Sequence, residues 1–238
     1  THSFNMDAYV EVFDGLDLQE AVSLEGWTAG LDFTLPINRT MQFRFLLPVR
    51  TEADGVLVDG GDDIDIKGWG GTFRFATLAF EHLIVGENGG PNRLAYMVGA
   101  GVRTANLETD TPDRYNHQGR SLHLGIRYDR VLARGGVLML DTELRFYEES
   151  DDLNPGDLID DRFFWGTING AWLLKERGPF TPGVELTAAL GENWTALSVV
   201  PELFIAAGDV VDLKFGVPIG VTTDAPNWGA QFRLTANF

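Results

Sequence analysis

Residues 231–238, Gln-Phe-Arg-Leu-Thr-Ala-Asn-Phe, alternate strictly between polar and apolar side chains. Successive side chains of a β-strand point to opposite faces, so Phe232, Leu234, Ala236 and Phe238 share one face and the polar residues share the other. Left exposed at the edge of a sheet, such a strand would pair with other chains. A β-barrel that crosses a membrane needs a strand of this kind, because it closes the sheet and turns its apolar face to lipid.

Strand-like runs recur along the whole chain. We expect twelve strands, at 4–13, 21–35, 40–50, 67–85, 93–106, 120–132, 137–147, 162–174, 182–190, 194–206, 210–222 and 227–238. Several have a clean apolar face, such as Met41, Phe43, Phe45, Leu47 and Val49. A tilted membrane strand needs about 9–11 residues, which these runs provide. The pattern predicts one domain over residues 1–238.

The connections between these runs alternate in length. Connections 51–66, 107–119 and 148–161 are long and rich in Gly, Pro, Asn and Asp, whereas 36–39, 133–136, 175–179, 207–209 and, slightly longer, 86–92 are short. Bacterial barrels have short periplasmic turns and long external loops. An even number of strands also returns both ends of the chain to the periplasmic side.

Composition excludes several classes of protein. The chain has no cysteine, which excludes disulfides and thiolate metal sites, and it has no run of about 18 apolar residues that would form a transmembrane helix. No basic and apolar leader precedes Thr1, so we expect a signal peptide to have been removed or never present. The net charge of −17 argues against nucleic acid as a partner. Of the 35 acidic residues, 13 lie in 51–66 and 147–161, which we interpret as solvated loops.

A soluble β-sandwich or a lipocalin-like barrel also shows alternation, because either protein buries one face of each strand. Three features favour the membrane instead: the final strand, the two classes of connection, and aromatic residues near strand ends that would form girdles at Trp27, Tyr96, Tyr128, Phe146, Trp172 and Trp228. We therefore expect an all-β, antiparallel, up-and-down transmembrane barrel of about twelve strands. It would lie in a bacterial outer membrane, in contact with lipid and lipopolysaccharide.

The other face of the strands would then line a lumen. Its expected charged residues are Asp7, Glu11, Asp32, Asp129, Asp141, Glu143, Glu185, Glu202 and Asp212, with Arg44, Arg50, Arg74, Arg103, Arg127, Arg145, Lys214 and Arg233. Opposite charges in a confined interior should pair. They would form an electrostatic plug, which we favour, or a polar conduit that sorts solutes. Aromatic surface inside or near the mouth is expected from Tyr9, Phe80, His82, Trp165 and Trp194, unless a β-bulge shifts their phase.

Ser121 and His123 stand two residues apart on one strand, so they share a face and can interact. Barrel phospholipases and deacylases tend to show the reverse order, His-x-Ser, with a third orienting group nearby, and they face lipid. We therefore expect no enzyme. A coincidental polar pair is the preferred interpretation.

The acidic segments Asp59–Asp65 and Glu149–Asp152 contain closely spaced carboxylates. Their spacing does not match a calcium-binding loop, so we expect no specific metal and no cofactor. Divalent cations that bridge these loops to lipopolysaccharide are an intermediate alternative.

Two segments resemble a particular family. Phe33–Arg39 followed by an apolar strand is similar to its N-terminal hairpin, and Val217–Gly220 followed by Asp224–Gly229 and the final Phe is similar to its last hairpin. The family is the outer-membrane group of transporter-like proteins of the phenol meta-degradation pathway. The resemblance implies passage of small, often hydrophobic or aromatic compounds. It supplies no set of functional residues.

These observations lead to three hypotheses. The first is an outer-membrane channel or uptake porin with a narrow charged lumen for small solutes. The second is a structural barrel sealed by salt bridges, with an envelope protein as its candidate partner. The third is an outer-membrane lipid hydrolase that uses Ser121 and His123.

Overall fold

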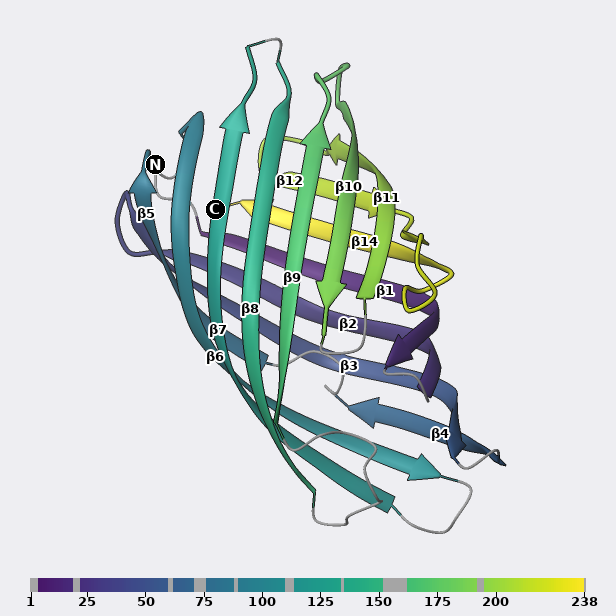
Figure 1. Ribbon diagram of the computed structural model, residues 1–238. Coiled ribbons are helices and arrows are strands. Elements are labelled where there is room, and N and C mark those ends of the chain that lie inside the picture. Colours follow the sequence, from purple (N-terminus) through teal and green to yellow (C-terminus); the bar gives the residue numbers. More distant parts are fainter. Residues whose placement is uncertain are drawn as a thin grey trace.

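The computed structural model describes residues 4–18, 22–59, 62–70, 76–87, 90–109, 114–133, 135–151, 162–191 and 195–237. The regular structure in these ranges is β-strand (Figure 1). The strands are β1 (Asn5–Leu18), β2 (Val22–Pro36), β3 (Met41–Asp59), β4 (Asp62–Gly70), β5 (Ala76–Val85), β6 (Asn92–Thr109), β7 (Arg114–Val131), β8 (Val137–Asp151), β9 (Arg162–Leu173), β10 (Phe180–Leu190), β11 (Thr195–Ala206), β12 (Val211–Gly216), β13 (Ile219–Gly220) and β14 (Trp228–Asn237). None of the described segments is a helix long and apolar enough to span a membrane.

The sheet closes on itself. All the pairings are antiparallel, and β1 pairs with β14 from Asn5 opposite Asn237 to Asp14 opposite Trp228. The described ends of the chain therefore lie side by side, as Figure 1 shows. Both β4 and β5 lie between β3 and β6, and both β12 and β13 lie between β11 and β14. Fourteen segments thus form a closed wall of twelve strands, which confirms the predicted barrel.

The turns at the end of the barrel that carries the chain ends are short. In the first, the Asn38 Oδ1 atom accepts hydrogen bonds from the backbone N–H groups of Thr40 (2.9 Å) and Met41 (3.0 Å). Two others contain a glycine with positive φ, Gly135 (73°) and Gly178 (64°), a conformation that side chains with a Cβ rarely adopt. The short connections predicted from sequence are turns.

The prediction that residues 51–66 form an acidic loop is wrong. Strands β3 and β4 continue through it as a paired hairpin, from Thr51 opposite Gly70 to Asp59 opposite Asp62. The connection 107–119 is likewise mostly strand, with Glu108 opposite Arg114. A hairpin that extends beyond the membrane has water on both faces, so its strands need no alternation of apolar and polar side chains. Its main-chain hydrogen bonds can therefore continue where the sequence shows no strand pattern. Of the acidic stretch 147–161, residues 147–151 belong to β8 and 152–161 lie outside the described residues.

A β-bulge changes the phase of β3. Gly30 pairs with Pro48 and Ala29 pairs with Arg50, so Val49 is an extra residue without an opposite partner. Beyond the bulge Thr51 is fully buried on the inner face, and its Oγ1 lies 2.8 Å from the Oγ1 of Thr28. The side chain of Arg50 is 65% exposed and bonds the outward Glu52 instead of lining the lumen. The inward prediction for Arg50 is wrong because a bulge adds one residue to the period of two.

Candidate functional site

The two faces of the wall differ in chemistry. Large apolar side chains are exposed on the outer face, as in β7 at Leu122, Leu124 and Ile126 and in β8 at Leu138, Leu140, Leu144 and Phe146. The alternate positions of the same strands are polar and point inward. Exposed apolar side chains on a closed barrel match lipid, and polar ones inside it match a lumen. The inner face is therefore the candidate site.

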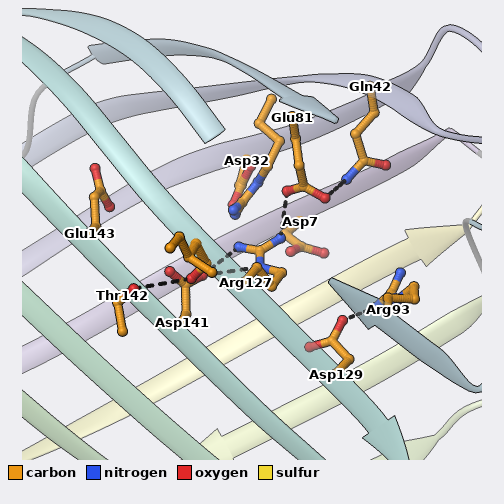
Figure 2. Close-up of polar contacts among 12 residues, drawn as sticks. Asp7, Asp32, Gln42, Glu81, Arg93, Arg127, Asp129, Asp141, Thr142 and Glu143 are labelled. Atoms are coloured by element: carbon orange, nitrogen blue, oxygen red, sulfur yellow. Dashed lines mark hydrogen bonds and ion pairs between the residues drawn. The ribbon is translucent and has the colours of Figure 1, made fainter. Parts of the chain in front are cut away.

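Arg127 of β7 is the centre of one ion-pair cluster (Figure 2). Its Nη2 atom lies 2.7 Å from Asp141 Oδ2 on β8, and its Nη1 atom lies 3.1 Å from Glu81 Oε2 on β5. Glu81 also accepts a 2.8 Å hydrogen bond from Gln42 of β3. One guanidinium therefore joins β7 to β8 on one side and reaches over β6 on the other.

Three smaller pairs stand near the same end of the barrel. Arg93 bonds Asp129 between β6 and β7, as Figure 2 also shows. Arg44 Nη2 lies 3.1 Å from Asp32 Oδ2 between β3 and β2. Arg233 Nη1 lies 3.2 Å from Asp7 Oδ2, which ties β14 to β1 where the barrel closes.

Lys214 of β12 serves two carboxylates. Its Nζ atom lies 3.1 Å from Glu185 Oε2 of β10, and it also contacts Glu202 Oε1 of β11. Gln231 donates to the same Glu202 at 3.4 Å. Nearby, Asn237 donates a 3.2 Å hydrogen bond to Asp212. Paired groups thus follow the wall from β10 through β14 to β3.

A fourth arrangement contains a histidine. Arg145 bonds both oxygens of Glu143, through Nε at 2.7 Å and Nη2 at 3.0 Å. The Glu143 Oε1 atom also lies 2.7 Å from His123 Nδ1, and His123 Nε2 lies 2.5 Å from Ser121 Oγ. Both Ser121 and His123 are buried.

Of the seventeen charged residues expected on the inner face, the structure places fourteen there: Asp7, Glu11 and twelve others. These twelve are Asp32, Arg44, Arg127, Asp129, Asp141, Glu143, Arg145, Glu185, Glu202, Asp212, Lys214 and Arg233. Arg74 lies outside the described residues, as do the side chain of Arg103 and the candidate Trp194. Any role of these residues in transport stays a prediction.

The sequence missed two members of these clusters, Glu81 and Arg93. On β5, Phe80 packs against the outward Phe43 with ring centroids 5.7 Å apart, and His82 packs against Tyr96 at 5.5 Å. The inward prediction for Phe80 and His82 is therefore wrong, and Glu81 between them points inward. The sequence signal that could have revealed the orientation of β5 was the possible pairing of Phe80 with Phe43, because Phe43 was already assigned to the lipid face. Tyr9 and Trp165 do lie on the inner face.

The pairs run along the wall and not across the lumen. Among the described residues, each of these partners lies on the same strand, on the adjacent strand or one strand further on. The inward cations also keep part of their side-chain surface accessible: 18% for Lys214, 26% for Arg127 and 35% for Arg233. Accessible surface on inward side chains requires open space beside them.

Metal ligands are not gathered in the described part of the chain, where no group of three His, Asp or Glu side chains is placed to hold an ion. The candidate calcium segments cannot be judged by this criterion. The side chains of 57–64 and of 148–152 lie outside the described set, which includes most of both segments.

Solved structures with the same fold are bacterial outer-membrane barrels. The COG4313 outer membrane channel from Pseudomonas putida F1 has a TM-score of 0.65 at 14% identity, over 100% of this chain and 96% of that one. The beta domain of the Bordetella autotransporter BrkA has a TM-score of 0.64 at 11% identity, over 100% of both chains. The translocator domain of the autotransporter NalP from Neisseria meningitidis has a TM-score of 0.61 at 8% identity, over 100% of this chain and 88% of that one.

No protein-family model and no curated protein matches the chain. Identities this low show a shared fold and do not assign the phenol meta-degradation family or a substrate. The fold and the apolar outer face together place the protein in a bacterial outer membrane, in contact with lipid.

Proposed function

We propose that this protein is an outer-membrane channel for small solutes, with a narrow lumen lined by paired charges. The observation that carries the proposal is the wall-bound arrangement of the ion pairs around Arg127, Lys214 and Arg233. Because the partners lie along the wall, pairing neutralises the charges without bridging the lumen. A solute then meets polar groups that are already satisfied, which lets it bind weakly and leave.

The solute class follows from the same surface. Charged and hydrogen-bonding side chains line the end of the lumen near the chain ends, so small polar or charged molecules are preferred over large apolar ones. Small aromatic cations fit this chemistry, because carboxylates outnumber cations among the described inward residues and Trp165 offers an aromatic ring on the same face. The channel described for Pseudomonas putida F1 is consistent with the proposal through its fold.

The test uses purified full-length protein in planar bilayers and in liposomes. Discrete conductance steps in KCl, and liposome swelling with benzylamine, a small aromatic cation, faster than with a disaccharide, are the expected results. A matched pair of variants checks the route: Arg127→Glu lies inside the barrel and should change single-channel conductance at least about twofold. Arg39→Glu lies in an exposed turn, where the side chain is 79% exposed, and should leave conductance unchanged.

Silence in both assays with correctly folded protein would contradict the channel. The sealed structural barrel would then be the better account, and an envelope protein that co-purifies at fixed stoichiometry would support it.

A further inference from the structure

Ser121, His123 and Glu143 lie on the inner face in a relay that the channel does not need. We propose that they form a nucleophilic site, which small water-soluble carboxylic esters acylate at Ser121 and which then releases the acid. The inference rests on the proposed function in one respect, because the ester reaches the site through the lumen.

The relay uses opposite nitrogens of one imidazole. Ser121 Oγ lies 2.5 Å from His123 Nε2, and Glu143 Oε1 lies 2.7 Å from His123 Nδ1. A nucleophile on Nε2 and a carboxylate on Nδ1 are the arrangement of serine hydrolases, which is recognised by geometry and not by order in the chain. The Ser-x-His order therefore carries no weight against the site.

The proton positions follow from the partners. Both oxygens of Glu143 accept N–H groups of Arg145, so this carboxylate acts as an acceptor. Nδ1 of His123 must then donate, and in the neutral ring Nε2 is left as an acceptor. The Ser121 hydroxyl donates to it, so His123 stands ready to take the serine proton.

One of the sequence arguments against catalysis was the missing third group. It comes from the neighbouring strand: Arg145 is opposite His123, and Glu143 is opposite Gly125, one step along the same face. Arg145 fixes the carboxylate, so it acts as a positioning residue for the relay.

The surroundings of Ser121 suit an acyl group. Gly101 of β6 lies directly opposite on one side, and Gly119 precedes it on the same face, so neither places a side chain over the hydroxyl. Tyr147 of β8 lies opposite on the other side and is also inward. Its phenol offers an O–H donor for a developing oxyanion.

The reaction balances with water as the only co-reactant. Ser121 Oγ bonds the ester carbonyl carbon while its proton moves to His123 Nε2. The bond from that carbon to the alkoxy oxygen breaks, and the alcohol leaves with this proton. Water then attacks the acyl-serine, again giving a proton to Nε2, and Ser121 is restored as the carboxylic acid departs.

The orientation of β7 determines which substrates can reach Ser121. Leu122 and Leu124 occupy the lipid side of β7, and the relay occupies the lumen side. Membrane phospholipid therefore does not reach Ser121 through the wall. Short esters dissolved in water approach from the lumen, where Ser121 keeps 7% of its surface exposed, and this separates the site from a lipid hydrolase.

The experiment uses the folded full-length barrel in detergent micelles, with diisopropyl fluorophosphate and p-nitrophenyl acetate as probes. Peptide mass spectrometry should find one phosphoryl adduct per chain, on Ser121. Acylation should be lost in Ser121→Ala and slowed about 100-fold or more in His123→Gln and Glu143→Gln. The control is Ser198→Ala, since Ser198 is an inward serine on β11 that is 8% exposed, close to the 7% of Ser121; it should react like the wild type.

An unlabelled Ser121 in folded wild-type protein would overturn the proposal, and so would equal labelling of wild type and His123→Gln. The channel is judged separately by conductance. A conducting barrel with inert Ser121 contradicts only the nucleophilic site. A labelled but silent barrel contradicts only the channel.

Discussion

At the scale of the residue, the interior is organised by cations that each serve more than one acid. Arg127 contacts Asp141 and Glu81, and Lys214 contacts Glu185 and Glu202. Glu81 is buried, so it depends on partners because water does not solvate it fully. Loss of one cation therefore exposes two acids to each other on the same face.

We expect Arg127→Met to lower the free energy of unfolding by about 1–3 kcal/mol, below the usual figure for a fully buried pair because the side chain is 26% exposed. Urea unfolding in detergent measures it. The triple variant with Glu81→Gln and Asp141→Asn should recover most of the loss, since neutral amides need no cation. Arg39→Met, which breaks only an exposed 3.9 Å pair with Glu87, should change stability by less than about 0.5 kcal/mol. Equal effects of Arg127→Met and Arg39→Met would contradict this reasoning.

A second residue-scale prediction concerns Gly30, which lies under the ring of Tyr9. A Cβ at this position would come within 2.4 Å of the Tyr9 hydroxyl oxygen and 2.7 Å of the Leu47 carbonyl oxygen. Gly30→Ala should therefore lower the free energy of unfolding by about 1–3 kcal/mol. Gly170 is the control, because a Cβ there meets nothing within 4 Å, and Gly170→Ala should be neutral or slightly stabilising. In urea unfolding, Gly30→Ala should have a lower midpoint concentration than Gly170→Ala.

At the scale of the element, the bulge in β3 keeps both halves of the strand in phase with their neighbours. Deleting Val49 removes the extra residue and leaves every pair on either side intact, with Gly30 opposite Pro48 and Ala29 opposite Arg50. We expect this deletion to fold with near-normal yield. Deleting Ile126 from the regular part of β7 should prevent folding, because a slip of one residue turns Arg127 and Asp129 toward lipid. Refolding yield in detergent compares the two, and equal yields would contradict the role of phase.

The positions of the strands could be predicted from the sequence, because the membrane requires apolar and polar side chains to alternate along each strand that crosses it. The pairing register could not, and the phase could be predicted only where no bulge or break interrupts the strand. The bulge at Val49 moved Arg50 outward, and the long run predicted at 67–85 concealed the phase that points Glu81 inward. The third member of the relay was hidden for the same reason, because only the pairing of β7 with β8 brings Glu143 to His123. The hairpin of β3 and β4 was missed because main-chain bonds, which leave no side-chain pattern in water, hold it together.

At the scale of the whole molecule, the described part of the inner face carries an excess of negative charge. The described inward carboxylates are Asp7, Glu11, Asp32, Glu81, Asp129, Asp141, Glu143, Glu185, Glu202 and Asp212, and the described inward cations are Arg44, Arg93, Arg127, Arg145, Lys214 and Arg233. Each cation cancels one carboxylate, and more carboxylates than cations remain. Confined charge of one sign enriches counter-ions in a narrow passage.

We therefore expect the channel to prefer cations, with a reversal potential in a KCl gradient displaced toward the potassium equilibrium value. The preference should weaken as ionic strength rises, because the screening length falls from about 10 Å at 0.1 M to about 3 Å at 1 M. Asp212 has an amide partner in Asn237 and takes part in none of the ion pairs described above, so Asp212→Asn removes lumen charge and leaves those pairs intact. It should reduce the cation preference, whereas Glu87→Gln in an exposed turn, where the side chain is 58% exposed, should not. The reasoning would be contradicted if the channel were anion-selective, or if Asp212→Asn left the cation preference unchanged. In either case the excess charge of the inner face would not determine which ions pass.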